Sequence, residues 1–224
     1  MNPDGRPRGD GGPGESTRRN LIAAVERLLA ERDDLDVSLR DITSTAGANI
    51  AAVNYHFGSK DALVHAVIEE ALRRHADAVL AGLEAVAASG GGVEDLVRAR
   101  LGPVVERTGG RRSLLPRIMA LVVSGGSPAL RDLGLRTQAE SEALFLGLLA
   151  DRLPDVPRDE LRFRIALAAS AASGLIVGVF ETAAIDHSSA ARRSEAVDKA
   201  VRFIAGGLSA QPVAKARTRS RVRT

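Results

Sequence analysis

The chain of 224 residues is long enough for one large domain or two small ones, and its 45% hydrophobic and 26% charged residues are ordinary for a globular protein. The absence of cysteine excludes disulfides, thiolate catalysis and cysteine metal ligands, and a single tyrosine without tryptophan argues against aromatic stacking of single-stranded nucleic acid. The net charge of +3 depends on a C-terminal tail with five basic residues and no acid, so the remainder has 26 basic and 28 acidic residues. Any nucleic-acid site must therefore come from a local motif.

Both ends of the chain have compositions typical of disorder. Residues 1–15 hold five glycines and three prolines, and we expect them to be disordered. Residues 211–224 form a basic disordered tail that is either solvated or in contact with phosphates. No apolar run resembling a secretory signal opens the chain, and its longest uncharged apolar stretch, Ile165–Phe180, is too short to span a membrane. We therefore expect a cytoplasmic protein without membrane contact.

The part between the two ends is predicted to be helical throughout. Strand signals are scarce, because Ala, Leu, Arg and Glu recur without sustained alternation of polar and apolar residues. Glycine and proline divide this part into about nine segments. The predicted helices cover residues 17–31, 39–46, 50–56, 60 to beyond 83, 93–105, 113–123, 128–152, 159–183 and 190–205. The apolar stripes expected to face a core are Leu21, Ile22, Val25, Leu28 and Leu29 in the first helix and Val197, Val201, Ile204 and Leu208 in the last.

The most informative segment runs from Ser38 to Lys60 and reads SLRDITSTAGANIAAVNYHFGSK. Ser38 precedes Asp41 by three residues, which is the spacing of a capping box, and Gly47 suits the left-handed position that ends a helix. Asn49 can cap a second helix only two residues later. Two short helices joined by so tight a turn cross steeply, as in a helix-turn-helix, whose second helix can enter a major groove.

The second helix of this motif has an inner and an outer face. Val53 and Phe57 are four residues apart and would anchor the helix to those before it. Ile50, Ala51 and Asn54 would point outward, where apolar groups can contact thymine methyls and an Asn can bond an adenine edge. The side chains expected to reach backbone phosphates at or beyond its end are Tyr55, His56 and Lys60.

The segment from Thr17 to Leu63 resembles the TetR family of transcriptional regulators. The resemblance rests on Ser-Leu-Arg-Asp-Ile at 38–42, Ala-Gly at 46–47 and Tyr-His-Phe-Gly-Ser-Lys-Asp-Ala-Leu at 55–63. It implies an all-α protein, with an N-terminal three-helix DNA-binding domain followed by a helical ligand-binding and dimerisation domain. On this basis we expect residues 16–60 to form the first domain and residues 61–210 the second. The usual activity of the family is repression that a small molecule relieves.

The resemblance also implies individual roles in DNA binding. It places the start of the recognition helix at 49–52 and Arg40 on the preceding helix, near the groove. Many members have Tyr where this chain has Asn54, followed by a variable residue, so either Asn54 reads a base or Tyr55 has taken over the phosphate contact. The candidate DNA-binding residues are Ser38, Arg40, Asn49, Ile50, Ala51, Ala52, Asn54, Tyr55, His56 and Lys60.

The last two predicted helices are the candidate dimer interface. Residues 159–183 are rich in Ala, Ser and Gly, which permit close helix contact, and with residues 190–205 they could form a four-helix bundle across a two-fold axis. A plain monomer core is the alternative. A pocket for a small-molecule inducer, for which a hydrophobic compound is one candidate, would lie between helices of the same domain. The polar residues there identify no ligand contact.

Two classes of function are compatible with these observations. The first is a ligand-responsive repressor that binds a near-palindromic double-stranded DNA operator as a homodimer. The second is a helical small-molecule-binding protein or enzyme that does not bind DNA. The intact motif at 38–60 favours the first. Because no metal-ligand spacing, phosphate-binding loop or catalytic motif is present, we expect no metal, no cofactor and no enzymatic activity.

Overall fold

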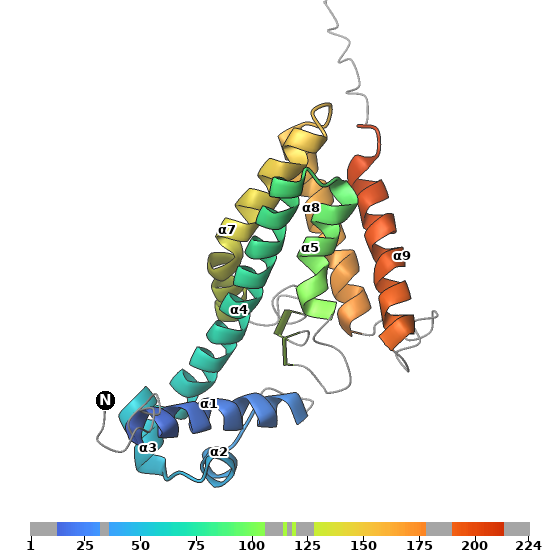
Figure 1. The fold of residues 1–224 in the computed structure, drawn as a ribbon. Helices are drawn as coiled ribbons and strands as arrows, with labels where there is room; N and C mark the ends of the chain where they lie inside the picture. Colours follow the sequence, from blue (N-terminus) through green and yellow to red (C-terminus); the bar gives the residue numbers. More distant parts are fainter. Residues whose placement is uncertain are drawn as a thin grey trace, which may run out of the picture. The chain divides into compact units, whose positions relative to one another are not determined.

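The computed structural model describes residues 13–31, 36–105, 114–115, 118–119, 128–177 and 190–212 (Figure 1). Within these ranges it has eight continuous helices and no strand, so the prediction of an all-α fold is confirmed. None of these helices is long and apolar enough to cross a membrane. The helices are α1 (Pro13–Glu31), α2 (Leu39–Ala46), α3 (Ile50–Phe57), α4 (Lys60–Ser89), α5 (Val93–Val105), α7 (Pro128–Arg152), α8 (Arg158–Val177) and α9 (Ala190–Ser209).

The first and last helices of the chain are longer than the sequence predicted. α1 begins at Pro13 instead of Thr17, so residues 13–15, which we expected to be disordered, are helical. Proline suits the first helical position because no N–H is needed there, and the carboxylate of Glu15 in the first turn interacts favourably with the helix dipole. α9 continues to Ser209, because Leu208 extends its buried stripe by another turn.

Parts of several predicted segments lie outside the described residues. These parts are residues 1–12 of the N-terminal segment, residues 178–183 of the helix at 159–183, and residues 213–224 of the basic tail. Of the helix predicted at 113–123, the structure describes residues 114–115 and 118–119, and these four are helical.

The chain forms two compact units. The first comprises the described residues within Met1–Ala76 and Glu106–Gln138, and the second comprises those within Asp77–Val105 and Ala139–Thr224. The divisions fall inside α4 and α7, whereas the sequence suggested a boundary between residues 60 and 61. The first half of α4 belongs to the first unit because Leu63, Val67 and Leu72 are fully buried in its core.

The core of the first unit joins α1, α2, α3 and the first half of α4. α1 packs against both α2 and α3. The stripe predicted for α1 is confirmed, since Leu21, Val25, Leu28 and Leu29 are buried and Ile22 packs at the edge of the core. Ile42 of α2 and Val53 of α3 have no exposed surface. α1 therefore shares one hydrophobic core with the helix pair α2–α3.

The core of the second unit joins α5, α8, α9 and the second halves of α4 and α7. α9 packs against α5 and α8 (Figure 1). The stripe predicted for α9 is confirmed, since Val201, Ile204 and Leu208 are buried and Val197 is partly buried. α4 and α5 approach closely at Gly82, where an added Cβ would lie 3.3 Å from the Cβ of Ala99.

Candidate nucleic-acid interface

Local hydrogen bonds fix both ends of α2. The Oγ of Ser38 accepts the backbone N–H of Asp41 at 3.1 Å and so begins the helix. Gly47 ends it in the left-handed conformation, with φ 63° and ψ 33°. The N–H of the next residue, Ala48, donates to the carbonyl of Thr43 at 3.0 Å. These are the bonds of a glycine-terminated helix, and they turn the chain sharply toward α3.

The ends of α3 are fixed in the same way. The Oδ1 of Asn49 accepts the N–H of Ala52 at 2.9 Å, and Gly58, with a positive φ of 80°, ends the helix. The Oγ of Ser59 then accepts the N–H of Ala62 at 3.1 Å at the start of α4. Caps satisfy amides that a helix leaves unpaired, so the bounds of α3 are set by its own neighbours. The predicted helix-turn-helix is therefore present.

α3 has one buried and one exposed face. Val53 is fully buried, and Phe57 packs against the core of the first unit, as predicted. The exposed residues of α3 are Ile50, Ala51, Asn54 and Tyr55, which we call the recognition face. Ile50 is 53% exposed and Tyr55 is 85% exposed, which is unusual for large side chains of this kind. The fold thus presents four neutral side chains to the surroundings.

The other candidate residues on α3 lie at the edge of the recognition face. Ala52 and His56 are half-buried. The ring of His56 meets that of Tyr55 edge to face, with 5.0 Å between the ring centroids. This contact orients Tyr55 at the C-terminal end of α3.

Three of the predicted DNA contacts also have partners within the protein. Ser38 and Asn49 use a side-chain oxygen as a helix cap. The Nζ of Lys60 lies 3.1 Å from Oδ1 of Asp36, on the segment before α2. An incoming phosphate would therefore compete with Asp36 for this ammonium. Arg40, on α2, has an exposed side chain.

α1 contributes a residue that the sequence analysis did not place at the site. The guanidinium of Arg18 lies 5.3 Å from the centroid of the Phe57 ring, at the end of α3, and Arg18 is exposed. Gly14 lies beside His56, because an added Cβ would be 3.8 Å from Cε1 of that ring. The sequence analysis began this helix at residue 17, which left Arg18 at its end. The helix begins at Pro13, so Arg18 lies in its second turn.

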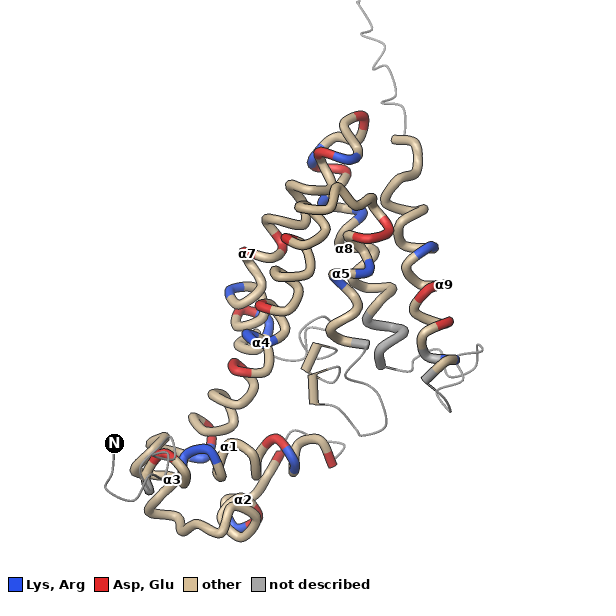
Figure 2. Tube along the Cα trace, in the orientation of Figure 1, with Lys and Arg blue, Asp and Glu red and all other residues tan. Residues whose placement is uncertain are grey.

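Charge surrounds the recognition face without lying on it. α3 contains no Lys, Arg, Asp or Glu, and Figure 2 shows it without a charged residue. The basic side chains of the adjoining helices include Arg18 on α1, Arg40 on α2 and Lys60 at the start of α4. The arrangement can separate two tasks, since neutral groups can read base edges while basic groups contact phosphates.

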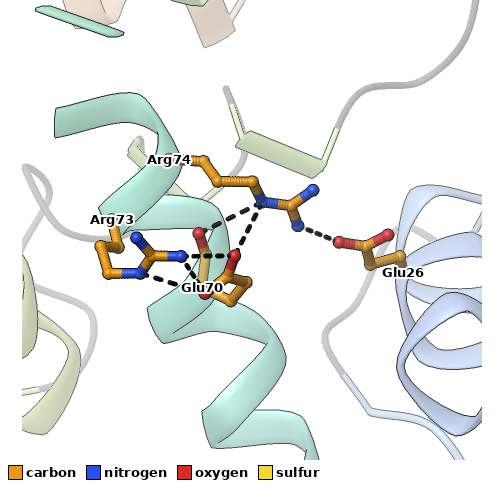
Figure 3. Close-up of polar contacts among 4 residues, drawn as sticks. All are labelled: Glu26, Glu70, Arg73 and Arg74. Carbon is orange, nitrogen blue, oxygen red and sulfur yellow. Dashed lines mark hydrogen bonds and ion pairs between the residues drawn. The ribbon is translucent and has the colours of Figure 1, made fainter. Parts of the chain in front are cut away.

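An ion-pair network joins α1 to α4 (Figure 3). Arg74 on α4 donates to the carboxylate of Glu26 on α1, and its Nε lies 3.5 Å from Oε1 of Glu70. Glu70 also accepts from Arg73 at 2.8 Å. Beside this network the two helices line an open groove of about 570 Å³, with four arginines and three glutamates in its walls. These charges nearly cancel, and the contact between Arg74 and Glu26 links α4 to α1.

Two family models match the chain. Residues 21–67 match the bacterial regulatory proteins of the tetR family, and residues 98–207 match the tetracyclin repressor-like C-terminal domain. Together they match 157 of the 224 residues. The first match contains the whole helix-turn-helix.

Curated relatives are similar over the N-terminal part. The HTH-type transcriptional regulator BetI of Rhizobium meliloti is 32% identical over 81 residues, which is 36% of this chain and 40% of that protein. BetI of Brucella anthropi is 39% identical over 56 residues, which is 25% of this chain and 29% of that protein. The chain thus matches less than half the length of these relatives.

Solved structures share the fold over most of the chain. A structural genomics target from Rhodococcus sp. RHA1 has a TM-score of 0.54 and 21% identity, with 86% of this chain and 95% of that chain covered. A member of the TetR transcriptional regulator family from Streptomyces coelicolor A3 has a TM-score of 0.51 and 22% identity, with 84% and 90% covered. With both family models matched and this fold shared, the chain belongs to the TetR family of bacterial regulatory proteins.

Proposed function

We propose that the protein is a transcriptional repressor that binds an operator in double-stranded DNA as a homodimer and is released by a small-molecule inducer. The observation that carries the proposal is the capped helix-turn-helix with the exposed, uncharged recognition face. Helices of this size and exposure fit the major groove. A regulator of this kind works where the chromosome is, which in a bacterium is the cytoplasm.

The recognition face supplies the sequence-reading groups in this proposal. Ile50 and Ala51 contact thymine methyl groups, and the amide of Asn54 bonds the edge of an adenine. Ala52 lies behind them and brings the first turn of α3 close to the bases. The capping bonds of Ser38 and Asn49 hold the two helices at the required angle, and the remaining polar atoms of these caps face the phosphates.

The phosphate contacts come from the edge of the site. Arg40, His56 and Lys60 flank the recognition face, and Arg18 joins them from α1. Tyr55 is the most exposed of the large hydrophobic residues that the structure describes, and we assign its hydroxyl to a phosphate and Asn54 to a base. Phosphate contacts release counterions, so the affinity for DNA falls steeply with salt.

The dimer is proposed to form through α8 and α9. Phe163 and Leu167 are 64% and 56% exposed on α8, and Phe203 is 76% exposed on α9, although large apolar side chains are normally buried. α8 and α9 pack against each other in the second unit, so the exposed apolar side chains of both helices belong to that unit. Gly206 and Gly207 leave open space on α9, which permits a partner helix to approach closely.

The two-fold symmetry of such a dimer determines the form of the operator. It would be near-palindromic, with half-sites about one helical turn, roughly 34 Å, or a multiple of it apart. α4 contributes residues to both units of the chain, so it is the element through which an inducer would alter the spacing of the recognition helices. The shift cannot exceed the difference in the inducer's affinity for the two states.

The test is a footprint of the purified protein on the DNA that flanks its own gene, at two salt concentrations. We expect a protected near-palindrome whose protection weakens at the higher salt. Random-sequence selection would follow if no site were protected there. Failure of that selection as well would contradict the proposal and favour a helical small-molecule-binding protein or enzyme without DNA binding.

Substitutions test the assignment of residues on the same operator. We expect Lys60→Ala to weaken binding to all sequences alike, and Asn54→Ala to change the preference among sequences. Arg131→Ala is the matched control, since Arg131 is an exposed basic residue of α7, outside the helix-turn-helix and outside α8 and α9. If both site variants bound like the control, the assignment would be wrong.

A further inference from the structure

The second unit contains a largely buried cation that the DNA-binding site does not use. Arg100 lies on α5, on the same face as Val97 and Val104, which are both buried. Its side chain is 15% exposed, although arginine is among the residues that are least often buried. Burial lowers its pKa to about 10, so the guanidinium stays charged at neutral pH and bears the cost of desolvation.

Few of the described residues contact this guanidinium. Within the described part of the chain, its contacts are a charged hydrogen bond from one terminal nitrogen to Glu142 on α7 and the face of the Phe145 ring, 5.9 Å away. A guanidinium has five N–H donors in a planar fork that matches a carboxylate in two parallel bonds. Arg100 therefore has the capacity to bind a second carboxylate.

Glu142 is a partner that can be replaced. Its side chain is 39% exposed, so it can turn into water at little cost, whereas Arg100 cannot. Removing the partner of a buried charge is costly, and a ligand carboxylate that takes the place of Glu142 would avoid that cost.

We propose that Arg100 anchors the acidic group of the inducer, which is an organic monocarboxylate. The carboxylate displaces Glu142, whose side chain is 39% exposed and so marks the side from which a ligand reaches Arg100. This inference rests on the proposed function, in that it names the chemical class of the inducer.

The experiment measures binding to the full chain without DNA, by isothermal titration calorimetry. The probes are octanoate and benzoate, which carry a chain and a ring, and the uncharged controls are octanamide and benzamide, each taken to millimolar concentration. We expect the wild-type protein to bind at least one carboxylate and to bind its amide far more weakly, because a buried guanidinium discriminates in favour of an anion.

Substitutions locate the site. We expect Arg100→Gln to weaken carboxylate binding by about 10- to 100-fold, the loss of a charged hydrogen bond. Glu142→Gln should strengthen binding, since it removes the competing carboxylate. Arg98→Gln is the matched control on the same helix, because Arg98 is half-exposed and pairs with Asp198 of α9. Arg100→Met combined with Glu142→Leu should stay folded, as judged by its melting temperature, and should lose carboxylate binding.

Several results would overturn the proposal. These are a wild-type protein that binds neither carboxylate, an amide that binds as well as its acid, or Arg100→Gln binding like Arg98→Gln. A footprint on DNA without carboxylate binding overturns this site and leaves the proposed function intact. Carboxylate binding by a protein that fails to bind DNA retains the anchor and removes the regulatory role.

Discussion

Gly47 shows how much of the candidate site depends on one backbone conformation. Its φ of 63° and ψ of 33° lie in the left-handed region, which costs a residue with a Cβ about 1–2 kcal/mol. The space around it is open, so the cost of a side chain there would come from the backbone alone. The turn that presents α3 to DNA thus depends on the absence of a Cβ at this position.

We expect Gly47→Ala to lower the free energy of unfolding by about 1 kcal/mol, because the strain exceeds the entropy that alanine removes from the unfolded chain. Gly147→Ala is the control. Gly147 lies within α7 without a positive φ, and an added Cβ would meet nothing within 4 Å. It should raise the stability by roughly 0.5–1 kcal/mol, as helix propensity predicts. Urea titrations of both variants measure these changes in the free energy of unfolding. Changes of the same size and sign in the two variants would refute the strain argument.

At the scale of single residues, the sequence predicts those structural features that depend on residues close together in the chain. The caps at Ser38 and Asn49 and the turn at Gly47 could be predicted, because each involves residues only a few positions apart. The ion pair of Lys60 with Asp36 spans 24 positions and forms only once α2, α3 and α4 have packed. The contact between Arg18 and Phe57 is of the same kind. Such contacts leave no local pattern in the sequence.

At the scale of elements, the link between α1 and α4 is the feature with the clearest consequence. Glu26 and Arg74, which are 48 positions apart in the sequence, join two helices of the first unit (Figure 3). Their side chains are 34% and 42% exposed, so water screens the pair. Pairs of this exposure contribute between about 0.2 and 1 kcal/mol, and their contribution falls with salt.

A double-mutant cycle with Glu26→Gln and Arg74→Gln isolates this pair, although Arg74 also contacts Glu70. We expect a coupling free energy of about 0.5 kcal/mol in low salt and less at high salt, measured by urea unfolding. A cycle with Glu26→Gln and Arg73→Gln is the control, because Arg73 bonds to Glu70 of its own helix. Coupling of the same size in both cycles would show a general effect of charge and not a link between α1 and α4.

At the scale of the whole molecule, the sequence predicts the fold class but not the division into units. Helical stripes and glycine punctuation identified most helix bounds, since those signals are carried within each helix. The division inside α4 depends on which core buries Leu63, Val67 and Leu72. Hydrophobic periodicity indicates that a face is buried without indicating its partner, so the boundary suggested at residues 60 and 61 differs from the packing.

The exposed apolar residues of the second unit lead to a prediction about assembly. Phe163 on α8 and Phe203 on α9 are each more than half exposed, which is the pattern of an unpartnered interface. We expect Phe163→Glu and Phe203→Glu each to weaken dimerisation by on the order of 30-fold or more, because a central aromatic contact contributes about 2 kcal/mol and a buried carboxylate would lack a partner. Sedimentation equilibrium measures the change directly.

Leu135→Glu tests whether the effect is specific to this surface. Leu135 is 64% exposed on α7, in the first unit, so the substitution makes the same chemical change away from α8 and α9. We expect it to leave the dimer unchanged. Because one subunit engages only one half-site, the two phenylalanine variants should also lose most of their operator affinity, while their melting temperatures as monomers stay close to each other. A wild-type protein that sediments as a monomer at micromolar concentration would contradict the dimer, and with it the near-palindromic operator.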